Sequence, residues 1–158
     1  MRQTPDVATV AEVIREVSRA EALSRFQSLQ AHEISEKSPG DLVTIADLET
    51  ERALNAALEA LLPGSVMVGE EAVADNPGLL DALQSVEDTC WIIDPIDGTI
   101  NYAHGVPLFA TMVALVVRGE VVGGWIYDPV HDAMAMAEKG GGAYLDQAQV
   151  RFDQSKEL

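Results

Sequence analysis

The chain has 158 residues, of which 47% are hydrophobic and 23% are charged, a balance typical of one globular domain with a sizeable core. With 10 Lys and Arg against 26 Asp and Glu, the net charge of −16 argues against binding to nucleic acid or to an anionic membrane surface. Cys90 is the single cysteine, which excludes an intrachain disulfide and a thiolate metal site. No apolar run approaches the roughly 18 residues of a membrane span. The N-terminus also lacks an apolar secretory segment, so we predict a cytoplasmic protein.

Two helices are predicted in the first part of the chain. Thr4-Pro5 is typical of an N-cap and first helical residue, and apolar residues then recur at helical spacing to about Leu29. The polar segment "HEISEKSPGD", residues 32–41, contains a Pro-Gly breaker and is predicted as a loop. Thr44 then caps a second helix that ends at Pro63-Gly64. The apolar face of this helix is predicted to be Ile45, Leu48, Leu54, Leu58 and Leu61.

Short strands are predicted after these helices. "SVMVGEE" at 65–71 and "TCWIID" at 89–94 are apolar runs, with a short helix starting at Asn76-Pro77 between them. From Phe109 onward, short apolar runs alternate with turn residues, which predicts an antiparallel meander. The fold class is therefore predicted to be α+β, with N-terminal helices packed on one face of a mainly antiparallel sheet.

Acidic residues follow two of the predicted strands. Glu70 and Glu71 end the first, while Asp94 and Asp97 end the second. If the two strands are neighbours, these carboxylates lie close together, and two carboxylates about 4 Å apart repel by roughly 4 kcal/mol at an effective dielectric constant near 20. Such a group must take up protons or bind a cation, and oxygen ligands alone favour Mg²⁺. The alternatives are a plain Asp-Pro turn for 94–97 and a solvated surface charge for Glu71.

Gly98 and Thr99 follow this acidic segment directly. Glycine allows close approach of the backbone to a ligand, and free N–H groups would form an anion site if Thr99 opens a helical turn. Asp47 lies three residues after Thr44, so it is either the acidic member of a capping box or a catalytic group.

Other chemically capable residues favour structural roles. The three histidines show no arrangement of a nucleophile with its base, and the two tryptophans are predicted in the core. The glycines at 140–142 indicate a turn, because neither a dinucleotide-binding glycine motif nor a Walker lysine is present.

Three segments together resemble the motifs of the inositol monophosphatase family of Mg²⁺-dependent phosphatases. They are "DLVTIAD" at 41–47, "GEE" at 69–71 and "WIIDPIDGTINY" at 91–102, in the family's order and at its spacing. "YDPVHDAMAMAEKGGGAYLD" at 127–146 is also similar, so the resemblance covers nearly the whole chain. It implies the first half of the family's layered α/β sandwich, with residues 1–158 as an N-terminal domain and a C-terminal domain absent. The family's Trp-Asp-x-Ala-Ala-Gly stretch, which carries a further metal ligand, is missing, since Trp91 and Trp125 are each followed by isoleucine.

The resemblance also implies roles for individual residues. Glu70, Asp94 and the carbonyl of Ile96 would hold one Mg²⁺, and Asp94 would bridge to a second ion held by Asp97. Asp97, Gly98 and Thr99 would bind the substrate phosphate. Catalysis would fall to Asp47, Thr99 and Glu70, with Glu71 beside the metal. Family members often carry a lysine near residues 38–41, and Lys37 lies close to that place. A small phosphorylated substrate and a homodimer are implied as partners.

Two functions remain open on the sequence. The first is Mg²⁺-dependent hydrolysis of a phosphate monoester, such as inositol monophosphate or a related small sugar phosphate, by an activated water. The alternative is a catalytically incomplete fragment or variant that binds metal or phosphate but lacks the C-terminal metal ligand.

Overall fold

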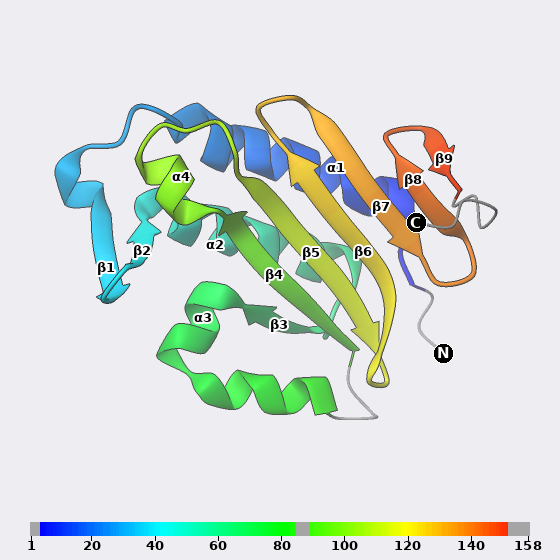
Figure 1. The fold of residues 1–158 in the computed structure, drawn as a ribbon. Helices are drawn as coiled ribbons and strands as arrows, with labels where there is room; N and C mark the ends of the chain where they lie inside the picture. The colour runs from blue at the N-terminus through cyan, green and yellow to red at the C-terminus, as the bar shows by residue number, and fades with distance from the viewer. Residues whose placement is uncertain (1–3, 85–88, 152–158) are drawn as a thin grey trace, which may run out of the picture.

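The computed structural model describes residues 4–84 and 89–151, which form one seven-stranded sheet, one two-stranded sheet and several helices (Figure 1). The large sheet has the strand order β3 (Val66–Gly69), β4 (Thr89–Asp97), β5 (Ala110–Val117), β6 (Glu120–Asp128), β7 (Ala133–Glu138), β8 (Gly142–Leu145) and β9 (Ala148–Val150). The small sheet pairs β1 (Ile34–Ser38) with β2 (Asp41–Thr44). The α-helices are α1 (Val7–Val17), α2 (Ile45–Leu61), α3 (Glu70–Asp75) and α4 (Thr99–Ala103).

The large sheet is mainly antiparallel, as predicted. Each pair from β4 to β9 is antiparallel, while β3 and β4 run parallel. A parallel pair needs a crossover connection, and α3 with the 3₁₀ helix η4 (Pro77–Gln84) lies in this one. The helix expected from Asn76-Pro77 is therefore present, in 3₁₀ form. The α+β fold class is confirmed.

Helices α1 and α2 cover one face of the sheet (Figure 1). Trp91 and Ile93 point to this side and are buried against both helices, as strand alternation requires. Ile92 and Asp94, which alternate with them along β4, line a hollow on the opposite face. The core thus lies between the helices and one face of the sheet, and the acidic end of β4 projects from the other face.

The N-terminal helix differs from the prediction at both ends. Its N-cap is Asp6, whose carboxylate accepts a hydrogen bond from the N–H of Thr9 at 3.0 Å, and not Thr4. The α-helix ends at Val17 and continues as a π-helix, η1 (Ser18–Ala22), and a 3₁₀ turn, η2 (Leu23–Arg25). The chain leaves helical geometry at Phe26, which has extended dihedral angles, so the helix does not reach Leu29.

The predicted loop at 32–41 is instead a 3₁₀ turn, η3 (Ala31–Glu33), followed by the β1–β2 hairpin. Ile34 pairs with Thr44 and Ser38 with Asp41, and Gly40 takes a φ of +83° in the turn. The prediction was wrong because backbone pairing holds this mostly polar hairpin, so its side chains show no apolar alternation.

Helix α2 begins after its predicted cap, Thr44, and Leu54 and Leu58 are buried as predicted. Leu48 is 47% exposed, which corrects its assignment to the apolar face. The buried stripe contains Asp47 and Glu51 instead, and Leu48 lies about 100° around the helix from Asp47. No helix in the described residues is long and apolar enough to cross a membrane.

Candidate metal and phosphate site

The parallel pairing of β3 and β4 brings Glu70 next to Asp94. Gly69 pairs with Ile93, so the residue that follows each lies at the same end of the sheet. Glu70 is the first residue of α3 and not the last of a strand, which corrects the predicted element and keeps the predicted proximity. The two acidic motifs therefore meet as the sequence indicated.

A bulge in β4 places Asp94 and Asp97 on the same side of the sheet. Asp94 pairs with Met112 and Asp97 with Ala110, so Pro95 and Ile96 together oppose the single residue Thr111. In a regular strand, residues three apart point to opposite faces. The extra residue restores a common face for the two carboxylates, and Asp97 acts electrostatically on Asp94.

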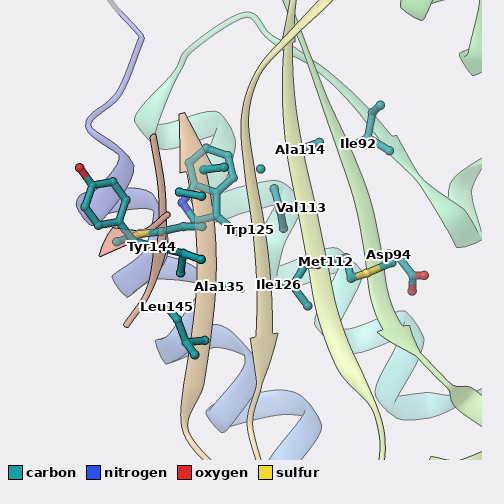
Figure 2. A pocket seen from close by; sticks show the side chains of 15 residues that line it. Ile92, Asp94, Met112, Val113, Ala114, Trp125, Ile126, Ala135, Tyr144 and Leu145 are labelled. Carbon is teal, nitrogen blue, oxygen red and sulfur yellow. The ribbon is translucent and has the colours of Figure 1, made fainter. Parts of the chain in front are cut away.

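Asp94 is a partly buried carboxyl with unmet bonding capacity. Its Oδ1 is buried and has no hydrogen-bond partner among the residues that the structure describes. The pKa of Asp94 is raised to about 7, first by burial, then by the charge and hydrogen bond of the Glu70 carboxyl, and then by the Asp97 and Asp47 charges. Figure 2 shows Asp94 beside Met112 at one end of the hollow on the open face of the sheet.

Asp47 completes the cap of α2 and also contacts Thr99. Its Oδ2 accepts hydrogen bonds from the N–H and the hydroxyl of Thr44 at 2.8 and 2.6 Å, which completes the capping box. Its Oδ1 contacts the Thr99 hydroxyl at 3.0 Å. Burial raises the pKa of Asp47, and the bonds from Thr44 and Thr99 offset only part of this rise. The alternatives left open by the sequence are therefore compatible.

Thr99 lies between Asp47 and the backbone of the bulge. Its hydroxyl is also 2.9 Å from the carbonyl oxygen of Ile96. A hydroxyl has one hydrogen, so Thr99 can donate fully to only one of these two acceptors at a time. Any cation drawn to the Ile96 carbonyl would leave this hydrogen to Asp47.

Helix α4 starts directly at the bulge, as the prediction for Thr99 required. Gly98 is its N-cap, with a left-handed φ of +89° that glycine adopts without strain. A Cβ at Gly98 would lie 3.0 Å from the carbonyl oxygen of Leu108, so space also favours glycine. The start of α4 is thereby held close to β5.

Lys37 on β1 reaches across to the acidic residues. Its Nζ lies 3.0 Å from Glu70 Oε1 and 3.1 Å from Glu71 Oε1. Burial lowers the pKa of Lys37, but the hydrogen bonds and charges of the two glutamates outweigh this and raise it. The hairpin thus supplies a cation to the site, which the loop prediction for residues 32–41 could not place.

Glu51 is a site residue that the sequence analysis missed. It is 5% exposed, and its carboxylate accepts hydrogen bonds from the N–H groups of Glu71 and Ala72 at 2.8 and 3.0 Å. A Cβ on Gly69 would lie 2.3 Å from the carboxylate carbon, so a larger residue would displace the carboxylate from this position. The available signal was the spacing of four residues from Asp47, which puts both acids on one helix face.

The donor set fits a hard divalent cation. Glu70, Asp94, Asp97 and the Ile96 carbonyl present oxygen atoms only, and Asp94 Oδ1 is buried without a partner. Within residues 4–84 and 89–151, however, no three His, Cys, Asp or Glu side chains are already arranged to hold a metal ion. Lys37 occupies the position of a cation at Glu70 and Glu71.

The remaining candidates take the structural roles predicted for them. Trp91, Trp125 and Cys90 are buried. His32 and His104 are exposed, and the exposed His131 pairs with Asp128.

The hollow on the open sheet face, of about 670 Å³, is lined mainly by apolar side chains from β4 to β9.

The chain is similar to a known family of phosphatases. A sequence model of the inositol monophosphatase family matches residues 3–158. The inositol-1-monophosphatases of Mesorhizobium japonicum and Bacillus subtilis are 39% and 37% identical, over 82% and 87% of this chain and 47% and 49% of their own. The Nus factor SuhB of Pseudomonas aeruginosa is 33% identical over 84% of this chain and 47% of its own. The chain thus spans about half the length of these curated relatives.

Solved structures agree with this similarity. The SuhB extragenic suppressor protein of Bartonella henselae superposes with a TM-score of 0.75 at 30% identity, covering 94% of this chain and 54% of its own. The IMPase of Thermotoga maritima gives a TM-score of 0.75 at 28% identity, covering 93% and 53%. The acidic motifs, the fold around them and the match over residues 3–158 lead to one conclusion: the chain belongs to the inositol monophosphatase family.

Proposed function

We propose that this chain supplies the metal and phosphate site of a Mg²⁺-dependent phosphomonoesterase. The observation that carries the proposal is the pairing of Glu70 with Asp94, whose buried Oδ1 has no partner in the described part of the chain. Neighbouring carboxylates, one of them partly buried, repel each other unless they are protonated or share a cation. A cation-dependent hydrolytic site would supply the cation that these carboxylates need.

Glu70, Asp94 and the carbonyl of Ile96 would hold one Mg²⁺, and Asp94 and Asp97 a second. When bound, the ions would lower the pKa of a water and stabilise charge on the phosphoryl group and the leaving oxygen. The bulge in β4 serves this arrangement because it turns Asp94 and Asp97 to one face.

Asp47 and Thr99 would orient the attacking water and receive its proton. The Thr99 hydroxyl lies between the bulge backbone and Asp47 Oδ1, so a proton accepted at the hydroxyl can pass to the carboxylate as the hydroxyl donates its own. Because burial raises the pKa of Asp47, its carboxylate is a stronger base than an exposed aspartate.

Asp97, Gly98 and Thr99 would bind the phosphate. Backbone N–H groups at the start of α4 would orient the phosphoryl oxygens. The names of the Mesorhizobium and Bacillus relatives favour an inositol monophosphate or a similar small sugar phosphate as substrate.

Release of inorganic phosphate from inositol monophosphate tests the proposal on the 158-residue chain, with and without Mg²⁺. We expect Mg²⁺-dependent release that falls by about 10²- to 10⁴-fold in Asp47→Asn, the range for loss of a general base. Glu59→Gln, at an exposed position of the same helix, is the control and should keep parental activity.

Calorimetric titration with Mg²⁺ separates the two functions that the sequence left open. Mg²⁺ binding without phosphate release would favour a metal- or phosphate-binding role for this chain. If the chain neither binds Mg²⁺ nor releases phosphate, the proposed site is contradicted.

A further inference from the structure

A buried hydroxyl supports the bulge that carries the acidic residues. At the bulge, Pro95 and Ile96 oppose Thr111 alone, so regular strand pairing cannot serve both of their carbonyl groups. The Thr111 hydroxyl lies 2.9 Å from the carbonyl oxygen of Pro95 and donates to it. Thr111 is 0% exposed, so water cannot replace this bond.

The π-helical segment η1 extends this support. Ser18, its first residue, is also 0% exposed and donates its hydroxyl to Thr111 Oγ1 at 2.9 Å. A chain of two buried hydroxyls therefore connects helix η1 through β5 to the Pro95 carbonyl. Short π-helical turns within α-helices are rare in proteins overall, but those that occur often lie at functional sites.

The same π-helical segment also contacts the far end of the site. Tyr102 of α4 is 1% exposed and donates its hydroxyl to the carbonyl oxygen of Ala22, the last residue of η1, at 2.7 Å. Its ring packs edge-on against Phe109 with the centroids 4.8 Å apart. The first and last residues of η1 thus support both ends of the segment 95–102: Ser18 acts through Thr111, and Ala22 contacts Tyr102 directly.

We propose that Ser18, Thr111 and Tyr102 are positioning residues, which hold the backbone of 95–99 so that its carboxylates and carbonyl face the cation. This inference rests on the proposed function. The geometry matters because a register slip of one residue at the bulge would turn Asp97 to the opposite face. Apolar side chains could fill the same volume, but they could not hold the Pro95 carbonyl in one direction.

Thr111→Val tests the inference, since it removes the hydroxyl and keeps the side-chain shape. In metal-free protein, we expect amide hydrogen exchange of segment 94–102 to be at least about tenfold faster, with β5 and β6 protected as before. The affinity for Mg²⁺ should fall by about 10- to 100-fold, as for loss of an outer partner of a metal ligand. Thr111→Ser, which restores the hydroxyl, should restore both values.

Thr50→Val is the matched control. Thr50 is also a 0% exposed threonine, but its hydroxyl has no partner among the described residues. We expect this variant to leave the exchange of 94–102 and the Mg²⁺ affinity unchanged. Ser18→Ala and Tyr102→Phe provide second variants if Thr111→Val does not fold, and each should accelerate exchange of the same segment.

Unchanged exchange of 94–102 in Thr111→Val, Ser18→Ala and Tyr102→Phe would overturn the positioning role. Failure of the parent chain to bind Mg²⁺ would instead contradict the proposed function. The exchange measurement needs no metal, so it decides the positioning role in either case.

Discussion

Two groups of carboxylates lie at the same end of the large sheet and differ in their partners. Around Asp94, four further acids, Glu70, Glu71, Asp97 and Asp47, act on one another. Lys37 is the cationic side chain that forms ion pairs with this group in the described chain.

The second group lies at the turn between β6 and β7. Asp132 is paired with Arg15 and Arg19 of the N-terminal helix, and the hydroxyl of Tyr127 donates to it at 3.0 Å. Asp128 accepts two backbone hydrogen bonds and pairs with His131. Each carboxylate of this turn therefore has its own donors.

The pKa values shift in opposite directions in the two groups. At the turn, partial desolvation raises the pKa of Asp132, but the Tyr127 hydrogen bond and the arginine charges outweigh it, so the pKa is lowered. At the site, burial and neighbouring acids raise the pKa of Asp94 to about 7. The carboxylates of the turn are supplied with donors, whereas Oδ1 of Asp94 has none among the described residues, and such a buried oxygen favours a cation.

The largest expected effect is the loss of metal binding in Asp94→Asn. Removal of an outer partner of a ligand costs about 10- to 100-fold in metal affinity, so loss of a direct ligand should weaken Mg²⁺ binding by more than about 100-fold. The metal-free variant should be as stable as the parent or more so, because one of the repelling charges is gone. Calorimetry and thermal unfolding measure the two values, and Asp81→Asn, exposed on η4, is the control. If Asp94→Asn bound Mg²⁺ as tightly as the parent, the acids around Asp94 would not differ from those of the β6–β7 turn in binding a cation.

Added Mg²⁺ should stabilise the parent chain. At a free concentration of 100 times Kd, binding to the folded state alone contributes about 2.7 kcal/mol. For a chain of this size this corresponds to an increase in Tm of about 5–10 °C. NaCl at matched ionic strength should not reproduce it, and an equal response to both salts would indicate screening of the net charge rather than a site.

Gly69→Ala should lower the stability of the fold, because it displaces the Glu51 carboxylate that supports α3. The new methyl would lie within 2.6 Å of the Glu51 carboxylate atoms, and overpacking of this kind costs about 1–3 kcal/mol. Gly124→Ala is the control, because nothing lies within 4 Å of a Cβ at that position. Urea unfolding compares the stability of the two variants. Equal stability would mean that the Glu51 carboxylate does not bind the N–H groups of α3.

The smallest expected effect concerns Asp132 at the turn between β6 and β7. Because the pKa of Asp132 is lowered in the folded state, its contribution to stability is present at neutral pH and is lost as the pH falls through the lowered value, below about 4. Asp132→Asn should therefore be less stable than the parent at pH 7, and the difference should shrink as the pH falls below 4. Urea unfolding across this range measures it, and a difference that stays constant with pH would show that the pairing contributes nothing.

The site could be predicted from the sequence where its residues depend on local rules. Acids at the ends of neighbouring strands gave the proximity of Glu70 and Asp94, and the spacing of Thr44 and Asp47 gave the capping box. The helical turn at Thr99 was only a condition in the sequence analysis, and the structure contains it.

The remaining features depend on long-range register and could not be predicted. The common face of Asp94 and Asp97 requires the bulge opposite Thr111, which only the pairing with β5 defines. Lys37 reaches the site only because a polar hairpin, predicted as a loop, pairs through its backbone. Glu51 was missed because a buried acid on an otherwise apolar helix face has a meaning only once α3 is placed against it.

The most direct test is a crystal structure of the chain grown with Mn²⁺, which substitutes for Mg²⁺ at oxygen ligands and scatters X-rays anomalously. The account predicts an anomalous peak between Glu70 and Asp94, in contact with the Ile96 carbonyl, and a displaced Lys37. A structure without a peak there, in which Lys37 still bridges Glu70 and Glu71, would contradict it.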